Sequence, residues 1–252
     1  MVVVGLVVWA VTSSPNWPEV RRAFFDGEEF ARSFPDIARA FRRNVQYFLI
    51  AEVFILGWAL VLAVLRSLSG PVFFPLRVLA IAYTDLFRGI PTVLVVYLLG
   101  FGVPSLGLPG VPDGAAFWAV VGLILTYSAY VAEVYRAGIE SVHPSQAAAA
   151  RSLGLSRWKS LRFVVIPQAV RRVIPPLLND FIGLQKDTAL VAFVVAVPEA
   201  FKQGQIYQAA DFNFTPLLGV ALMFLLVTIP LTRFTDWMIE RQRRKRQTGA
   251  VP

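Results

Sequence analysis

Three long apolar stretches set the first constraint on this chain. Residues 47–65 contain a single charged residue, Glu52, residues 115–132 contain none, and residues 216–234 stay apolar until Arg233. A helix needs about 20 mostly apolar residues to cross the ~30 Å hydrocarbon core of a bilayer. The sequence therefore predicts an all-α integral membrane protein.

Two further stretches are long enough to span a membrane but carry charges and helix breakers. Residues 76–101 contain Asp85, Arg88 and the interruption Gly89–Ile90–Pro91. Residues 173–190 carry five polar side chains, which are Asn179, Asp180, Gln185, Lys186 and Asp187. We expect about five transmembrane helices, with residues 189–198 either continuing the fifth or forming a re-entrant lip.

The composition agrees with this class and removes several others. Of the 252 residues, 56% are apolar and 16% are charged, against about 25% charged in soluble domains. This excludes a disordered chain, a nucleic-acid-binding arm and an ordinary cytosolic enzyme. The chain has no cysteine, a single histidine (His143) and no GxxxxGK[ST] phosphate loop. We therefore expect it to bind no metal or cofactor and to hydrolyse no ATP by itself.

The distribution of basic residues predicts the orientation in the membrane. Residues 136–172 hold seven lysines and arginines and residues 241–246 hold five, whereas residues 102–114 hold none. Short loops rich in lysine and arginine face the cytoplasm. We therefore expect a multi-pass protein with a cytoplasmic C-terminus. The net charge of +8 then reflects topology and contact with lipid, and it does not indicate nucleic acid.

The first 44 residues are expected to stand apart from the membrane domain. Residues 1–11 form an apolar run of about half a span, which leaves open whether they insert as an additional span. Residues 16–44, with six arginines and five acidic residues, look like a water-exposed segment. We therefore divide the chain into an N-terminal segment (1–44), a transmembrane domain (45–240) containing the loop 133–172, and a basic cytoplasmic tail (241–252).

The long basic loop between the third and fourth spans has the pattern of two short helices joined by a turn. Pro144 opens a helical stretch that Gly154 ends in the manner of a C-cap, and Ser156 can cap a second helix. Pro167 is expected to interrupt that helix before the next span.

The same loop carries a motif. Ala148–Ala149–Ala150, Gly154 and Pro167 stand at the spacing EAA, three residues, Gly, nine residues, I-x-L-P, with Ala148 in place of the glutamate. This motif resembles the loop signature of permease subunits of ATP-binding-cassette importers. The resemblance implies the type I importer fold and a coupling helix that docks into the ATPase subunit. The implied coupling residues are Ala148, Ala149, Ala150, Arg151, Gly154, Leu155, Ser156 and Pro167.

Three other segments extend the resemblance, namely DLFRGIP (85–91), YVAEVYRAGIESV (130–142) and PPLLNDFIGLQKDTAL (175–190). They are similar to permeases of the polar-amino-acid uptake branch, of glutamate/glutamine type. This implies a bacterial cell-membrane importer that works by alternating access. Its implied partners are an ATPase subunit that binds ATP and magnesium, an extracytoplasmic amino-acid-binding protein and a second permease subunit, identical or similar.

Polar residues within the spans are the candidates for a translocation pathway. Discontinuous, charged membrane helices often line such pathways. The candidate pathway residues are Glu52, Asp85, Arg88, Asn179, Asp180, Lys186 and Asp187. A structural interpretation stays open for some of them, because Asp85 and Arg88 could neutralise each other at a subunit interface and Glu52 could form an interhelical hydrogen bond. Glu133 and Arg136, also three residues apart, are expected to brace the loop that follows.

Three alternatives to the importer explain the sequence less well. An ion-coupled secondary transporter normally shows inverted repeats and more spans, and no convincing repeat is present. A membrane-embedded enzyme needs a catalytic constellation, but Glu52, Asp85 and Asp180 lie on three different expected spans. A non-transport assembly protein does not explain the charged, broken spans.

Overall fold

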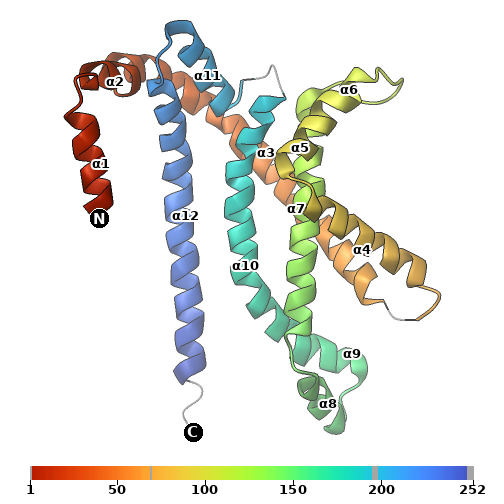
Figure 1. Cartoon of the computed structure of the whole chain (residues 1–252). Coiled ribbons are helices and arrows are strands. Elements are labelled where there is room, and N and C mark those ends of the chain that lie inside the picture. The colour runs from red at the N-terminus through yellow and green to blue at the C-terminus, as the bar shows by residue number, and fades with distance from the viewer. Residues whose placement is uncertain (1, 69, 195–197, 249–252) are drawn as a thin grey trace.

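The chain folds into a bundle of helices. The computed structural model describes residues 2–68, 70–194 and 198–248, and every regular element within those ranges is a helix (Figure 1). Four long helices form the frame: α3 (Gly27–Ser67), α7 (Ala115–Glu140), α10 (Ile166–Asp187) and α12 (Thr215–Thr248). This confirms the all-α class, which suits a bilayer because helices satisfy their own backbone hydrogen bonds.

Three of these helices are long and apolar enough to cross a membrane. They are α3 with the preceding α2 (Trp17–Phe24), α7 and α12. A fourth span results if α4 (Phe74–Gly89) is counted together with the segment Thr92–Ser105, which bends away from it by 101°. That segment consists of α5 (Thr92–Tyr97), the π-helix η1 (Leu98–Gly102) and α6 (Val103–Ser105).

The bend after α4 follows from the Gly89–Ile90–Pro91 interruption in the sequence. Ile90 and Pro91 adopt extended backbone conformations, with ψ angles of 132° and 131°. A proline disfavours helical geometry in the residue before it, so the helix ends there. The expected break is therefore present, and it turns the chain sharply.

Helix α3 is longer than expected and continues through the boundary placed after residue 44. At 1.5 Å per residue its 41 residues extend about 60 Å, twice the hydrocarbon thickness. One buried stripe runs through both halves, from Ser33, Ile37 and Phe41 to Ala51 and Ile55. Because this stripe keeps helical spacing across residue 44, one face of the N-terminal half packs on the bundle, while several arginines on its other face stay exposed.

Two short helices precede α3. The apolar α1 (Val2–Thr12) is followed by the amphipathic α2, whose end is tied to the start of α12. The amide N–H of Phe214 donates to the carbonyl of Ala23 over 2.7 Å, and the rings of Phe24 and Phe214 stack with centroids 5.0 Å apart. The turn into α12 therefore helps to position the N-terminal segment.

A buried polar network joins α3 to the end of the bundle opposite the loop 141–165. Asn44 on α3 donates to the carboxylate of Glu199 over 2.7 Å and to the hydroxyl of Thr188 over 3.2 Å. Thr188 begins the 3-10 helix η3 (Thr188–Phe193), which continues α10, and Glu199 caps α11 (Ala200–Asp211). Glu199 is fully buried, and burial raises the pKa of its carboxyl group.

Removing the amide of Asn44 should loosen this end of the bundle. We expect Asn44→Ala to cost about 2 kcal/mol, because the buried carboxylate of Glu199 loses its side-chain donor. Thermal unfolding in detergent measures the effect. Gln46→Ala, at an exposed position on the same helix, is the matched control and should leave the midpoint unchanged. Equal midpoints for the two variants would contradict the role assigned to Asn44.

Candidate docking loop and translocation pathway

The loop predicted between two spans forms a compact unit at one end of the bundle. Helices α8 (Pro144–Ser152) and α9 (Arg157–Ser160) lie beyond the ends of α7 and α10 (Figure 1). His143 caps α8 through its Nδ1 atom, which accepts from the amide of Ser145 over 3.2 Å. Ser156 caps α9 by accepting from the amide of Lys159 over 3.3 Å, as the sequence predicts.

The turn between α8 and α9 depends on Gly154. Its φ angle is +87°, a left-handed conformation that strains any residue with a Cβ atom. The amide of Gly154 donates to the carbonyl of Arg151 over 3.0 Å, and that of Leu155 donates to the carbonyl of Ala150 over 3.2 Å. These two bonds form a Schellman motif, which confirms Gly154 as the residue that ends the helix.

The turn presents apolar side chains away from the bundle. Leu153 is 85% exposed and Trp158 is 64% exposed. Ala148 and Ala149 lie on the exposed face of α8, whereas Ala150 is buried toward α9. The hydroxyl of Ser160 donates to the carbonyl of Ala147 over 3.3 Å and holds the two helices together. Protruding apolar side chains on a rigid turn are suited to fill a groove on another protein.

The sequence predicts that Pro167 interrupts the helix, but the structure shows no interruption at this residue. The π-helix η2 (Leu161–Val165) joins α9 directly to α10, so residues 157–187 form one continuous helical run. Pro167 lies in the first turn of α10, where its missing N–H is tolerated, and the wider π turn precedes it. The second helix of the loop therefore continues into α10 without a break.

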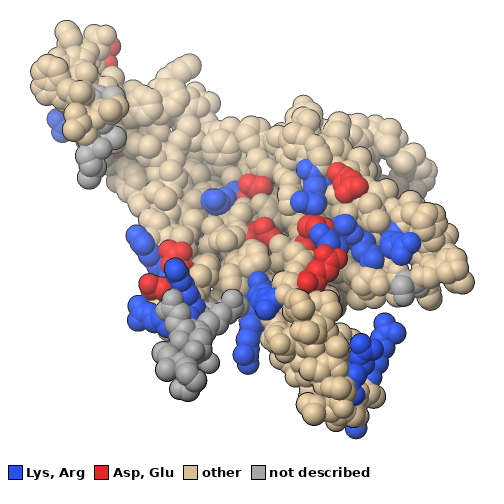
Figure 2. Space-filling model, turned by 60° about the horizontal axis from the view of Figure 1, so that its bottom comes forward, with Lys and Arg blue, Asp and Glu red and all other residues tan. Residues whose placement is uncertain are grey.

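The loop is uniformly basic. Residues 141–179 contain six lysines and arginines and no aspartate or glutamate. Figure 2 turns this end toward the viewer and shows basic side chains across it, with acidic side chains gathered nearer its middle. Between α8 and α9 a cavity of about 520 Å³ is lined by Arg151 and Arg157, among others. An acidic surface would complement this unit.

Glu133 on α7 is the centre of an ion-pair cluster that joins three helices. Its carboxylate lies 3.0 Å from Nη1 of Arg66 on α3, 3.1 Å from Nε of Arg136 on α7 and 4.0 Å from Nη1 of Arg88 on α4. The predicted Glu133–Arg136 pair is confirmed. The Arg66 contact could not be predicted from local spacing, because 67 residues separate Arg66 from Glu133 in the sequence.

Asp85 and Arg88 share a helix but form no ion pair with each other in the described structure. Arg88 turns instead toward α7, where it approaches Glu133 and lies 5.9 Å from the ring centroid of Tyr130. Asp85 is exposed on α4. The packing of α4 against α7 therefore selects the partner of Arg88, and spacing along the helix does not.

The polar residues of α10 divide between two environments. Asn179 and Lys186 are exposed, whereas Asp180 and Asp187 are partly buried. Asp187 accepts from the hydroxyl of Tyr127 on α7 over 2.9 Å, a partner that the sequence analysis missed. Within the described ranges, no group of acidic and histidine side chains could hold a metal ion.

Asp180 on α10 and Glu52 on α3 are both partly buried, and their two helices are in contact. The Oδ2 atom of Asp180 is buried without a hydrogen-bond partner among the described residues. Glu52 thus lies on α3, which packs against α10, whereas Asp85 and Arg88 lie on α4, which packs against α7.

Neutralising Glu133 should destabilise the contact between α3, α4 and α7. We expect Glu133→Gln to cost about 2 kcal/mol, because the partly buried Arg66 and Arg136 lose their common counter-charge. Glu240→Gln is the control, since Glu240 and Arg244 form a pair whose side chains are 68% and 76% exposed. Thermal unfolding in detergent should show a lower midpoint for the first variant only. Matching midpoints would show that the cluster contributes no stability.

Comparisons with known proteins agree with this architecture. Residues 55–245 match the family described as binding-protein-dependent transport system inner membrane component. The probable amino-acid permease protein YxeN of Bacillus subtilis is 34% identical over 221 residues, covering 87% of this chain and 96% of the relative. The probable glutamine ABC transporter permease protein GlnM of the same organism is 35% identical over 192 residues, covering 76% and 85%.

Solved structures show the same fold. A crystal structure of an amino acid ABC transporter with histidines aligns with a TM-score of 0.76 at 28% identity, covering 86% of this chain and 98% of that chain. The MetNI methionine ABC transporter, at 17% identity and a TM-score of 0.61, supports the fold alone. The chain belongs to the binding-protein-dependent transport system inner membrane component family, the membrane-embedded permease subunits of ATP-binding-cassette transporters, in which ATP hydrolysis resides on a separate subunit.

Proposed function

We propose that this chain forms half of the translocation pathway of an ATP-driven importer for a polar amino acid of the glutamate/glutamine class. The observation that carries the proposal is the α8–Gly154–α9 unit, which presents Leu153 at the tip of a rigid turn and is continuous with α10. The names of relatives, which are amino-acid and glutamine permeases, suggest this class of substrate. An extracytoplasmic binding protein delivers the substrate.

The docking unit couples the chain to an ATPase subunit. Leu153 and the exposed face of α8, with Ala148 and Ala149, enter a groove on that subunit, and the basic side chains of α9 face acidic residues there. Alanine at position 148 leaves α8 one polar contact fewer than the family signature. ATP and magnesium bind on the partner, and closure of the ATPase dimer moves α10 through the continuous helical run.

The exposed polar side chains of the spans need a covering surface. Arg88, Asn179 and Lys186 are exposed in the single chain, and at membrane depth such groups face a partner or a water-filled cavity. A second permease subunit, identical or similar, supplies the other half of that cavity. Arg88 and Lys186 attract the carboxylate of the substrate, while Asp180, Asp187 and Glu52 act from the partly buried side, and Asp85 extends the polar surface along α4.

The docking unit defines the cytoplasmic side of the cell membrane in this proposal. The C-terminal end of α12 then lies in the cytoplasm, and α6 and α11 lie at the outer end of the bundle (Figure 1). The basic tail after residue 240 contacts anionic lipid headgroups on the cytoplasmic side.

Changing Gly154 tests the coupling role directly. A Cβ atom at φ +87° costs about 1–2 kcal/mol of local strain and disturbs the turn that orients α8. We expect Gly154→Ala to insert normally but to lose most substrate-stimulated ATPase activity and uptake in reconstituted vesicles. Gly57→Ala, in α3 with open space around it, is the matched control and should transport normally. Full uptake by the Gly154 variant would refute the coupling role.

Removing single charges tests the pathway. We expect Lys186→Ala and Arg88→Ala to lower uptake by roughly 10- to 100-fold, since a charge-assisted hydrogen bond to the substrate carboxylate contributes about 1.5–3 kcal/mol. Assembly with the ATPase, measured by co-purification, should change much less. Lys186→Arg retains the charge and should recover part of the uptake, and Arg241→Ala in the tail serves as a control. Normal uptake by both alanine variants would show that other residues line the pathway.

A further inference from the structure

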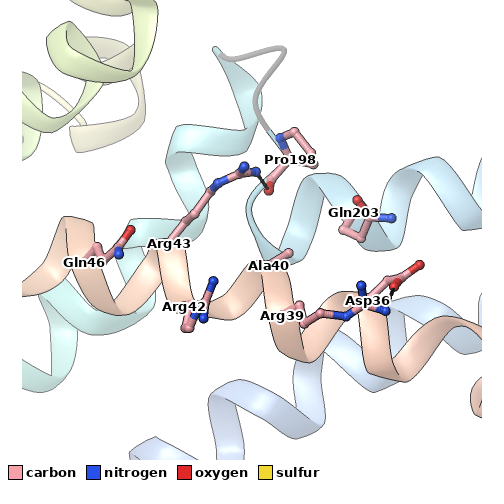
Figure 3. Close-up of a pocket in the computed structure, with 8 residues that line it drawn as sticks. All are labelled: Asp36, Arg39, Ala40, Arg42, Arg43, Gln46, Pro198 and Gln203. Carbon is pink, nitrogen blue, oxygen red and sulfur yellow. Dashed lines mark hydrogen bonds and ion pairs between the residues drawn. The ribbon is translucent and has the colours of Figure 1, made fainter.

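A polar cavity lies between α3 and α11, at the opposite end of the bundle from the docking unit. It measures about 420 Å³. Figure 3 shows Arg39, Arg42, Arg43 and Gln46 along α3, with Pro198 and Gln203 across from them. None of these side chains belongs to the proposed pathway or to the docking unit.

The cavity carries excess positive charge. Asp36 is the acidic residue in its lining, and its carboxylate already accepts from Arg39 and from the hydroxyl of Tyr207 over 2.5 Å. Arg43 uses one N–H on the carbonyl of Pro198, which leaves further donors on its guanidinium. Arg42 is exposed and forms no hydrogen bond or ion pair with any residue that the structure describes. An anion could therefore bind without displacing an internal ion pair.

The position of the cavity along α3 places it at the level of lipid headgroups. The apolar run of α3 begins at Tyr47, and Arg43 precedes it by four residues, about 6 Å along the helix. The headgroup layer adds about 5–7 Å on each side of the hydrocarbon core. Helix α3 is inclined relative to α7 and α12 (Figure 1), which brings Arg39 and Arg42 nearer to the same layer.

The number of arginines in this segment is also unusual for the side of the membrane on which the proposed orientation places it. Six arginines precede Tyr47, on the side opposite the basic docking unit. The positive-inside rule disfavours arginine and lysine near the outer ends of spans. A bound anion explains why three of these arginines gather around one cavity.

We propose that the cavity binds the phosphodiester headgroup of an anionic phospholipid. Arg42 and Arg43 contact the phosphate oxygens, since guanidinium groups match phosphate geometry through paired N–H donors. The amides of Gln46 and Gln203 face the polar part of the headgroup, and the acyl chains lie along the exposed apolar side chains Val45 and Leu49. The bound lipid bridges α3 and α11, while the assignment to the outer leaflet rests on the proposed orientation.

Native mass spectrometry of the purified transporter tests the site. The complex is exposed separately to phosphatidylglycerol, to phosphatidylcholine and to inorganic phosphate. We expect a retained phosphatidylglycerol adduct that falls about fivefold in Arg42→Gln, because a basic residue near an anionic lipid contributes about 1 kcal/mol. Arg42→Lys keeps the charge and should retain most of the adduct, and Arg21→Gln, at an exposed arginine of α2 outside the cavity lining, controls for general charge loss. Because Arg42 is exposed, thermal unfolding should show both Arg42 variants folded.

Any one of the following results would overturn the proposal. Equal phosphatidylglycerol adducts in wild type and Arg42→Gln would show that the lipid binds elsewhere. Equal retention of phosphatidylcholine, or binding of inorganic phosphate alone, would exclude recognition of an anionic lipid headgroup. Loss of binding-protein-stimulated ATPase activity in Arg42→Gln with unchanged lipid adducts would assign the arginines to protein docking instead. The lipid measurement needs no transport, so it can fail while the proposed import function stands.

Discussion

The hydrocarbon core of the bilayer offers no water to backbone or charged groups, and the fold can be understood as a response to this constraint. All the long elements are helices, which satisfy their own amide and carbonyl groups. The helix ends before Pro91, whereas at Pro167 a preceding π turn keeps the helical run continuous. Charged side chains at membrane depth either form clusters, as around Glu133, or lie on faces that a second subunit can cover.

A single helical run connects the docking unit to the part of the chain within the membrane. The Schellman turn at Gly154 fixes α8 against α9, and the helical run of residues 157–187 carries α9 into the bundle without a flexible joint. Asn179 and Lys186 lie on that same run. In the proposed coupling, motion imposed on α8 would reach polar groups within the membrane through this run, while the Glu133 cluster joins α7 to α3 and α4.

The two ends of the bundle are built from different interactions. The docking end is basic and exposes Leu153 and Trp158, as expected of a surface that another protein covers. The opposite end is held internally, because Asn44, Thr188 and Glu199 form a buried network beneath the arginine-lined cavity. A lipid in that cavity would add an external bridge between α3 and α11, the same two helices that Asn44 and Glu199 connect.

The sequence alone determined the features that depend on local spacing. Apolar length predicted the helical membrane class, and the motif spacing from Ala148 to Pro167 predicted the family. The positions of Gly154 and Ser156 likewise predicted helix caps that the structure contains. These features depend on residues within a few positions of one another, so the sequence displays them directly.

Tertiary packing decided which distant side chains meet. Arg88 pairs with Glu133 and not with Asp85, Arg66 joins the same carboxylate across 67 residues, and Tyr127 finds Asp187 across 60. Packing also placed the arginines of α3 around a cavity that α11 borders on the other side. The strength of an ion pair or hydrogen bond depends on distance in space, and only the crossing of α3, α4, α7 and α10 sets those distances.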